Sequence, residues 1–417
     1  MKLTKRFRIK TDERLLAICK VANNLYNQTL YYWQQRRDND NEYLNYYALR
    51  DEMRNVPNLE GTKNYYLMNA HVSEFVIKLA YDAIDSFYKQ IKDWKQHPEK
   101  YRAKPEFPHY HKSGGFTEVQ FDAHEFKIKD GLIIYNKKKG YGIPIPQRDK
   151  WEERFKRAKI VRVLPNQDYM IIEVVYEAEV QQANVDIQNV AAIDLGVDNL
   201  ATLVSASGCT IYNGKPLKSY NQYFNKKLAK AKSILDKQQP ERRSSKRIRQ
   251  MYDKRDRYID TYMHTVSCRI VEKLVVEHVG LLVVGRNKGW KQEANMGKVS
   301  NQRFTQIPFF KLQDQLRYKC EMVGIKYVEQ EEGYTSKCDA LAMESIENHD
   351  SYEGNRKKRG LFQSSTNKLI NADQNGALNI LRKYLGDELY KEATKDWKLP
   401  APIYIVNNFI KQEQINE

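Results

Sequence analysis

Acidic residues stand at three places in this 417-residue chain where a predicted strand ends or a predicted helix begins. Such residues at such positions could bind a metal ion. Asp194 follows the apolar run 190–193 and precedes a Leu-Gly pair. Asp373 stands at the start of the helix-like segment NADQNGALNILRKYL, and Glu331 and Glu332 end the strand-like segment GIKYVEQEE. Carboxylate oxygens are the ligands that Mg²⁺ prefers, and two such ions can activate water and stabilise the leaving oxygen in phosphodiester hydrolysis.

Each acid also has a purely structural interpretation. Asp194 could shape the turn DLGVDN, because Asp and Gly favour turns. Asp373 could be an N-cap, a position that Asp favours. Glu331 and Glu332 could be solvated loop charges, in which case the metal site is broken. The acids indicate catalysis only if the fold brings them to one place.

The order of elements after residue 190 predicts that it does. We expect strands at 190–194, 200–205 and about 209–213, a long basic helical region at about 217–278, a strand at 280–285, a helix at about 308–322, a further strand and a last helix. This is the order of an RNase H-like α/β fold, whose first strand is central in the sheet order 3-2-1-4-5. The carboxyl end of that strand borders a crevice where ligands collect, so Asp194 would lie there and Asp373 could face it.

The third carboxylate is the difficulty in this prediction. The fourth strand ends at Gly285, where an acid would be expected. Glu331 and Glu332 end the neighbouring strand on the same edge of the sheet, and a Glu side chain is long enough to reach across. The missing acid is therefore predicted one strand over, at either glutamate.

The first half of the chain predicts a small β-barrel with a helical insertion. Residues 2–10 alternate like a strand, 12–95 show helical spacing after a cap at Thr11 or Asp12, and the Pro- and Gly-rich stretch up to residue 115 is a linker. Short strands follow over about 116–180, including a hairpin with Asp130-Gly131 at its turn and another turning at 165–168. The fold class is multidomain α+β.

The charge balance predicts a polyanion as partner. The chain has 70 Lys+Arg against 53 Asp+Glu, a net charge of +17, and is 41% hydrophobic, so it is a folded basic protein. The simpler alternative is an ordinary enzyme with a basic surface. Predicted phosphate contacts are Arg242, Arg243, Lys246, Arg247, Arg249, Lys254 and Arg255, which could instead pair with Glu241, Asp253 and Asp256, and near the start Lys5, Arg6 and Arg8. Trp290 could stack on a nucleotide or close the core.

The cysteines and the apolar runs limit the setting. None of the five cysteines lies in a C-x-x-C pair, so neither a disulfide framework nor a four-cysteine zinc site is expected. The reducing bacterial cytosol or nucleoid is the expected location. The first ten residues show no signal-peptide pattern, and no apolar run has membrane-spanning length, so no membrane partner is expected.

Several motifs resemble those of TnpB, the RNA-guided nuclease of bacterial insertion sequences and a relative of type V CRISPR effectors. They are AAIDLGVDNLAT, GYTSKC and NADQNGALNI, supported by NLYN at 24–27 and by HTVSCRIV. The resemblance implies a wedge barrel (1–11 and 113–189), a helical recognition domain (12–112) and a RuvC nuclease domain (190–417). It also implies a guide RNA made from the transposon end, a double-stranded DNA target, and a short adjacent DNA motif read by the first two domains.

Two departures from the family pattern matter. The family's middle glutamate is Gly285 here, but relatives such as the Fanzor proteins use a shifted glutamate before the YTS motif, which matches Glu332 best with Glu331 beside it. The family's zinc ribbon keeps only Cys338, which with His349 cannot complete a tetrahedral site. We therefore expect two Mg²⁺ ions and no structural zinc. The degenerate insert, at about 338–367, would offer the basic residues Arg356, Lys357, Lys358 and Arg359.

The sequence thus predicts an RNA-guided, Mg²⁺-dependent DNA endonuclease with Asp194, Asp373 and Glu332 or Glu331 as metal ligands. One alternative is a nuclease-inactive, RNA-guided repressor, favoured by Gly285. Another is a transposase or Holliday-junction resolvase that shares the fold and needs no RNA. The sequence leaves open whether the chain acts as a monomer or a dimer.

Overall fold

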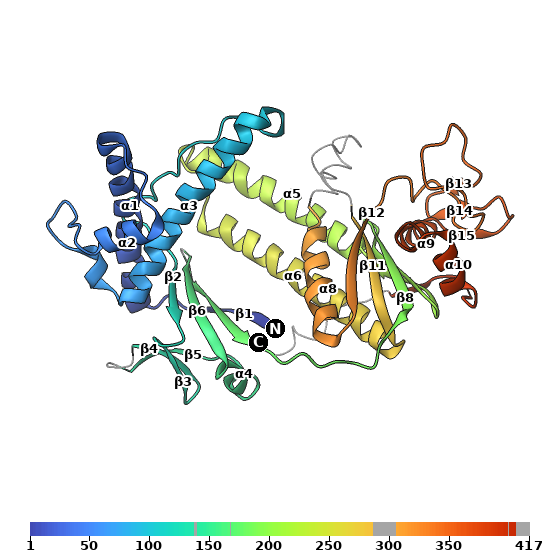
Figure 1. The fold of residues 1–417 in the computed structure, drawn as a ribbon, viewed down its shortest axis with the longest axis horizontal. Helices are drawn as coiled ribbons and strands as arrows, with labels where there is room; N and C mark the ends of the chain where they lie inside the picture. The colour runs from blue at the N-terminus through green and yellow to red at the C-terminus, as the bar shows by residue number, and fades with distance from the viewer. Residues whose placement is uncertain (137–139, 167, 287–305, 399, 406–417) are drawn as a thin grey trace. The chain divides into compact units, whose positions relative to one another are not determined.

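The computed structural model of this protein describes residues 1–136, 140–166, 168–286, 306–398 and 400–405, so Trp290 lies outside the described residues. The chain divides into two compact units, Met1–Glu179 and Val180–Glu417. Both units contain helices and sheets, which gives the mixed α+β fold that the sequence predicts (Figure 1). Among the described residues, no helix is both long enough and apolar enough to cross a membrane.

The second unit is built on a six-stranded mixed sheet with the order β12-β11-β8-β9-β10-β16. The central strand β8 pairs in parallel with β11, which pairs in parallel with β12, while β9 and β10 follow β8 as antiparallel neighbours. The first five strands therefore have the predicted order. The strands are β8 (Asp186–Leu195), β9 (Asn199–Ser205), β10 (Gly208–Asn213), β11 (Val279–Arg286), β12 (Lys326–Glu331) and β16 (Ile403–Ile405).

The sheet is buried on both faces, and the side chains of β8 alternate between them. Ala191 and Ile193 join the hydrophobic core that α6 (Lys246–Val276) and α8 (Phe309–Val323) complete. Val190 and Ala192 join a second core with α9 (Ala372–Leu385). Because successive side chains of a strand point to opposite faces, Asp194 lies on the α9 side.

The predicted basic helical region is two helices rather than one. The first, α5 (Lys215–Gln238), ends shortly before Pro240, which cannot donate a helical hydrogen bond, and α6 begins after the N-cap Ser245. The two helices contact each other through the stacked rings of Tyr220 and Tyr258, whose centroids lie 3.9 Å apart. After α9 the short helix α10 (Asp387–Thr394) follows.

The insert between β12 and α9 forms a small antiparallel sheet, β13-β14-β15. Its strands are β13 (Asn355–Lys358), β14 (Leu361–Gln363) and β15 (Leu369–Asn371). The last of these runs directly into α9, so the insert is continuous with the helix that carries Asp373 in its first turn (Figure 1).

The first unit holds two sheets, of the orders β1-β7-β6-β2 and β3-β4-β5. Strand β1 pairs with β7, and both predicted hairpins form; Asp130 and Gly131 have φ values of 53° and 74°, as a tight hairpin turn requires. The hydrogen bonds between the described strands give two sheets over one shared core, not one closed barrel. The strands are β1 (Lys2–Ile9), β2 (Val119–Asp122), β3 (Lys127–Lys129), β4 (Leu132–Asn136), β5 (Tyr141–Pro144), β6 (Ala158–Pro165) and β7 (Met170–Glu177), with the helix α4 (Arg148–Phe155) before β6.

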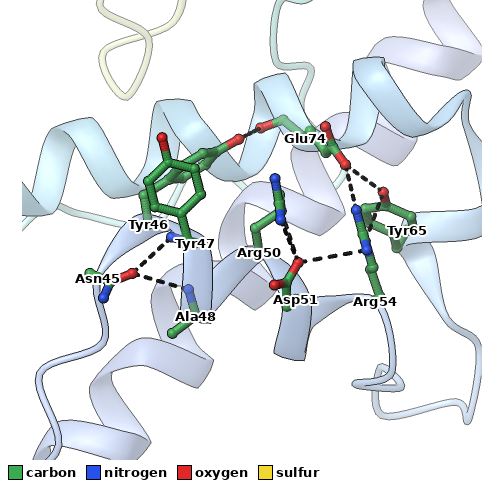
Figure 2. Close-up of polar contacts among 9 residues, drawn as sticks. All are labelled: Asn45, Tyr46, Tyr47, Ala48, Arg50, Asp51, Arg54, Tyr65 and Glu74. Atoms are coloured by element: carbon green, nitrogen blue, oxygen red, sulfur yellow. Dashed lines mark hydrogen bonds and ion pairs between the residues drawn. The ribbon is translucent and has the colours of Figure 1, made fainter.

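A helical block lies between β1 and β2 in the chain, as predicted. It contains α1 (Glu13–Asp40), α2 (Tyr46–Met53), η1 (Asn64–Leu67), α3 (Ala70–Gln96) and η2 (Pro98–Lys100). Asp12 caps α1 by accepting the backbone N–H groups of Arg14 and Leu15. Figure 2 shows how Arg54 joins the block: its guanidinium donates to Glu74 of α3 at 2.8 Å and to the Tyr65 hydroxyl at 3.3 Å.

Candidate active site

Asp194 lies near the carboxyl end of the central strand, directly opposite Thr202 of β9. Burial raises the pKa of the Asp194 carboxyl well above its usual value, and the charges of Glu332 and Asp373 raise it further. Arg356 and the Leu195 N–H act in the opposite direction. The charges of the two other predicted acids therefore act directly on Asp194.

Asp373 lies in the first turn of α9, where the N-terminal end of the helix favours a negative charge. It is not the N-cap itself: Asn371 holds that position and accepts the N–H groups of Asp373 and Gln374. The Asp373 carboxylate is oriented by Asn199, whose amide donates to it at 2.6 Å. The structural interpretation of Asp373 as a simple cap is therefore wrong, and its side chain is left to face the sheet edge.

Glu332 follows the last residue of β12, and its carboxylate lies against Gly285 at the end of β11. A Cβ atom built on Gly285 would lie 2.8 Å from the carboxyl carbon of Glu332 and closer still to its Oε1. The glutamate thus fills the space from which a side chain at position 285 would start. Burial, and then the charge of Glu331, raises the pKa of Glu332 to about 7.

Glu331 points away from this cluster. Its carboxylate pairs with Lys383 of α9 at 2.6 Å and accepts the N–H of Gly333, and its side chain is 60% exposed. The hydrogen bond from Lys383 holds the pKa of Glu331 below its usual value. Of the two glutamates that the sequence left open, the structure brings only Glu332 to Asp194.

The three acids suit a divalent cation by their chemistry. In this conformation, no three His, Cys, Asp or Glu side chains among the described residues are grouped closely enough to hold one ion. The charges of Glu332 and Asp373 nevertheless raise the pKa of Asp194. A hard cation bound between carboxylate oxygens would reduce such repulsion. The oxygen donors of these three acids fit Mg²⁺ by their chemistry.

The predicted basic residues of the helical pair fall into two groups. Arg242 and Arg243 lie in the turn between α5 and α6 and are exposed, as are Lys246, Arg247 and Lys254, while Arg249 is half-buried. Arg255 differs: it donates to the Asn221 side chain at 2.8 Å and to the Gln306 backbone at 3.2 Å. Its guanidinium is engaged in holding α6 to its neighbours, because Asn221 is on α5.

The basic residues of β1 divide by the alternation of the strand. Arg6 and Arg8 lie on the exposed face, Arg6 paired with Glu173 of β7 and Arg8 over the Tyr169 ring. Lys5 lies on the other, half-buried face against Trp151. Burial lowers the pKa of Lys5, so this residue differs from the exposed cations predicted beside it.

Arginines of the insert lie beside the acidic cluster. Arg356 Nη2 is 4.0 Å from Asp373 Oδ1, and Arg359 pairs with Asp198, which also accepts a hydrogen bond from Lys218. Lys357 and Lys358 are exposed. The basic hairpin of the insert therefore lies next to Asp373 at the start of α9.

The inside of the insert holds residues whose importance the sequence reasoning missed. Asp339 is fully buried and accepts the N–H groups of Leu341, Ala342 and Ser365. Glu344 accepts those of Asp339 and Glu353. From α9, three buried polar side chains bond the insert backbone: Asn375, Asn379 and Arg382.

A signal for these α9 residues was present in the sequence. Asn375, Asn379 and Arg382 recur at i, i+4 and i+7, so they share one face of a helix whose neighbours are apolar. Polar residues on such a face must find buried partners. Asn199, the partner of Asp373, is the last residue of the segment DLGVDN that begins with Asp194.

Comparisons with known proteins match several stretches of the chain. A model of the OrfB family of IS605 elements, described as a probable transposase, matches residues 173–291, and a model of the Cas12f1-like TNB domain matches residues 309–380. A TnpB-like protein of Acidianus two-tailed virus, ORF457, is 28% identical over 211 residues, which are 47% of this chain and 42% of the viral protein. The chain thus matches less than half the length of this relative.

A solved structure shows a similar fold. The protein of a Cas12f1–sgRNA–target DNA complex superposes with a TM-score of 0.55 at 16% identity, over 88% of this chain and 82% of the other. The aligned residues therefore include parts of both units. The chain is therefore similar to the OrfB family of IS605 elements over residues 173–291 and to the Cas12f1-like TNB domain over residues 309–380.

Proposed function

We propose that this protein is an RNA-guided DNA endonuclease that hydrolyses phosphodiester bonds with Mg²⁺. The observation that carries the proposal is the position of Glu332, whose carboxylate fills the space beside Gly285 on the sheet edge that presents Asp194. An acid is thereby available where the family's own glutamate is missing. In this proposal, residues 190–417 form a RuvC nuclease domain.

Asp194, Glu332 and Asp373 would hold two Mg²⁺ ions. When bound, these ions would supply an activated water and stabilise the leaving oxygen. The protein's own residues prepare the site: Asn199 fixes the Asp373 carboxylate, and the turn after β12 directs Glu332 inward while Lys383 holds Glu331 outward. Cleavage would leave a 5′ phosphate and a 3′ hydroxyl, and one site would cut both strands in turn.

The nucleic-acid partners would be a guide RNA and a double-stranded DNA target. The net charge of +17 supports this, and so do the exposed cations of the α5–α6 turn and of the insert. In this proposal, Arg356 and Arg359 exchange their acidic neighbours for phosphates when the substrate enters. The helical block and the sheets of the first unit would act as recognition and wedge domains that read a short DNA motif.

An RNA-guided repressor without nuclease activity is the second candidate. The observation that favours it is that, in the described part of the chain, no three acids are grouped to hold an ion in this conformation. The retained pair Asp194 and Asp373 opposes it, because a binding protein needs neither. A resolvase or transposase that acts without RNA is a third candidate, and RNA that copurifies with the protein would exclude it.

One cleavage assay tests the proposal. The protein is expressed with its native downstream DNA, and the RNA bound to the purified protein is sequenced. That RNA is then redirected against a plasmid library with randomised flanking bases in Mg²⁺, beside an Asp194→Ala control. Cutting by the wild type that is lost in the control supports the proposal, whereas RNA-dependent binding without cutting supports the repressor.

A further inference from the structure

Two glycines of the second unit occupy positions where glycine lowers stability. Gly285 is the penultimate residue of β11 and pairs with Gln330 of β12, and Gly376 lies inside α9. A glycine within a helix or strand is less favourable than alanine, because glycine loses more conformational freedom on folding. Neither residue has the positive φ that would require a glycine. Their backbone conformations are therefore open to any residue, and the reason for glycine must be space.

Both glycines face carboxylates of the candidate site. A Cβ on Gly376 would lie 2.9 Å from Asp194 Oδ2 and 3.4 Å from its Cγ. A Cβ on Gly285 would lie 2.8 Å from the carboxyl carbon of Glu332 and 2.8 Å from Ile380 Cδ1. Contacts under 3.0 Å force one partner to move, so an alanine at either position would displace one of these groups.

We propose that Gly285 and Gly376 are positioning residues that leave the space in which Glu332 and Asp194 take up their metal-binding positions. This inference rests on the proposed function, because it concerns the same acids. It also explains how the acid can stand after β12 instead of at the end of β11. Because residue 285 has no side chain, the Glu332 carboxylate can occupy the space beside it.

The surroundings leave little freedom to absorb an added methyl group. The carbonyl of Gly285 accepts a hydrogen bond from Gln313 of α8 at 3.1 Å, which fixes the end of β11. α9 is tied to the insert by Asn379 and to the β12 turn by Lys383. Because both backbones are held, the carboxylates are the groups that would move.

A third glycine offers a matched control. A Cβ on Gly333 would lie 2.7 Å from Glu331 Oε1, so it too would meet a carboxylate. Glu331 is largely exposed and can swing into solvent. Gly333→Ala therefore adds the same methyl group against the same chemical group, but outside the acidic cluster.

The test measures Mn²⁺ binding by titration calorimetry on the full-length chain freed of nucleic acid in high salt. The variants are Gly376→Ala, Gly285→Ala, Gly333→Ala, Asp194→Ala and the double variant Gly376→Ala/Asp194→Ala. Gly285→Ala/Ile380→Val removes the clash with Ile380 and keeps the clash with Glu332. Thermal unfolding checks each fold; Gly376→Ala should not lower the Tm, since alanine favours the helix.

We expect Gly376→Ala and Gly285→Ala to weaken Mn²⁺ binding about tenfold or more, and Gly333→Ala to bind like the wild type. Gly376→Ala should add nothing in the Asp194→Ala background, because it acts through that carboxylate. Wild-type binding in both glycine variants, with binding lost in Asp194→Ala, would overturn the inference and leave the proposed function standing. Wild-type binding that Asp194→Ala leaves unchanged would overturn both.

Discussion

Two pairs of enclosed acids in the second unit differ in how their charge is satisfied. Asp339 and Glu344, inside the insert, together accept hydrogen bonds from five backbone N–H groups, all of which belong to the insert. Asp194 and Glu332, at the sheet edge, lie so close that the charge of Glu332 raises the pKa of Asp194. The first pair has its hydrogen bonds supplied by backbone N–H groups of the insert, whereas in the second pair the charge of Glu332 disfavours the charge of Asp194.

The difference shows that burial alone does not mark a functional acid. A buried carboxylate with several backbone donors stabilises the fold, because each donor would otherwise lack a partner. Neighbouring carboxylates with raised pKa values cost stability, and such groups are more frequent at functional sites. Acids of the same two types thus stabilise the insert in one place and, in the proposed function, would bind a metal ion in the other.

The largest expected effect comes from removing charge at the sheet edge. Asp194→Asn should lower RNA-guided cleavage more than about a hundredfold, because it removes a metal ligand. The same change should leave the Tm unchanged or raise it by about 1–2 °C, since it ends the repulsion among the acids. Cleavage assays and thermal unfolding of the metal-free protein check both parts, and a marked loss of Tm would remove the contrast drawn here.

Removing charge inside the insert should have the opposite outcome for stability. Asp339→Ala leaves the N–H groups of Leu341, Ala342 and Ser365 without their acceptor, at a cost of about 3 kcal/mol or more. Limited proteolysis should then cut within 338–371, and the Tm should fall by several degrees. The control Asp350→Ala, at an exposed position of the same insert, should change neither. An Asp339→Ala protein as resistant as the wild type would break the comparison.

A smaller effect is expected where the sheet edge itself uses a hydrogen bond. Asn199→Ala removes the amide that orients Asp373 and should slow cleavage about tenfold with little change in Tm. Asn199→Asp, which places a like charge beside Asp373, should slow it further. Cleavage rates at saturating Mg²⁺ give the measurement, and equal rates for Asn199→Ala and the wild type would mean that Asp373 needs no such orientation.

The smallest expected effect is that of a zinc-selective chelator. The polar network of Asp339, Glu344, Asn375, Asn379 and Arg382 joins the insert to α9 through protein groups. We therefore expect the Tm and the protease resistance of the insert to be unchanged by the chelator. A fall in Tm of several degrees that added zinc reverses would contradict this prediction. It would show that a zinc ion, and not the polar network alone, stabilises the insert.

The main features of the sheet could be predicted from the sequence because they follow from short-range patterns. Apolar runs of strand length and their order gave the central position of the strand that ends with Asp194. Parallel strands bring their carboxyl ends to one edge, which placed the 331–332 pair near Asp194. The break between α5 and α6 had a local signal in Pro240, although the prediction ran one helical region through it.

The choice between Glu331 and Glu332 depended on facts that no local pattern contains. Adjacent residues at a strand end point in different directions, and β12 ends between the two. Lys383, 52 residues later, fixes the outward direction of Glu331. The insert network was equally hidden, because its carboxylates bond to backbone groups in irregular loops, where residue type carries little information. The space beside Gly285 appears only when β11 and the turn after β12 are seen together.

In the proposed function Glu332, and not Glu331, supplies the third carboxylate. The most direct test compares RNA-guided plasmid cleavage by Glu332→Gln and Glu331→Gln, two identical changes at adjacent residues. We predict that Glu332→Gln loses more than about a hundredfold in rate, while Glu331→Gln, which loses only an exposed ion pair, stays within about twofold of the wild type. Full cleavage by Glu332→Gln, or loss of cleavage in Glu331→Gln alone, would contradict the claim.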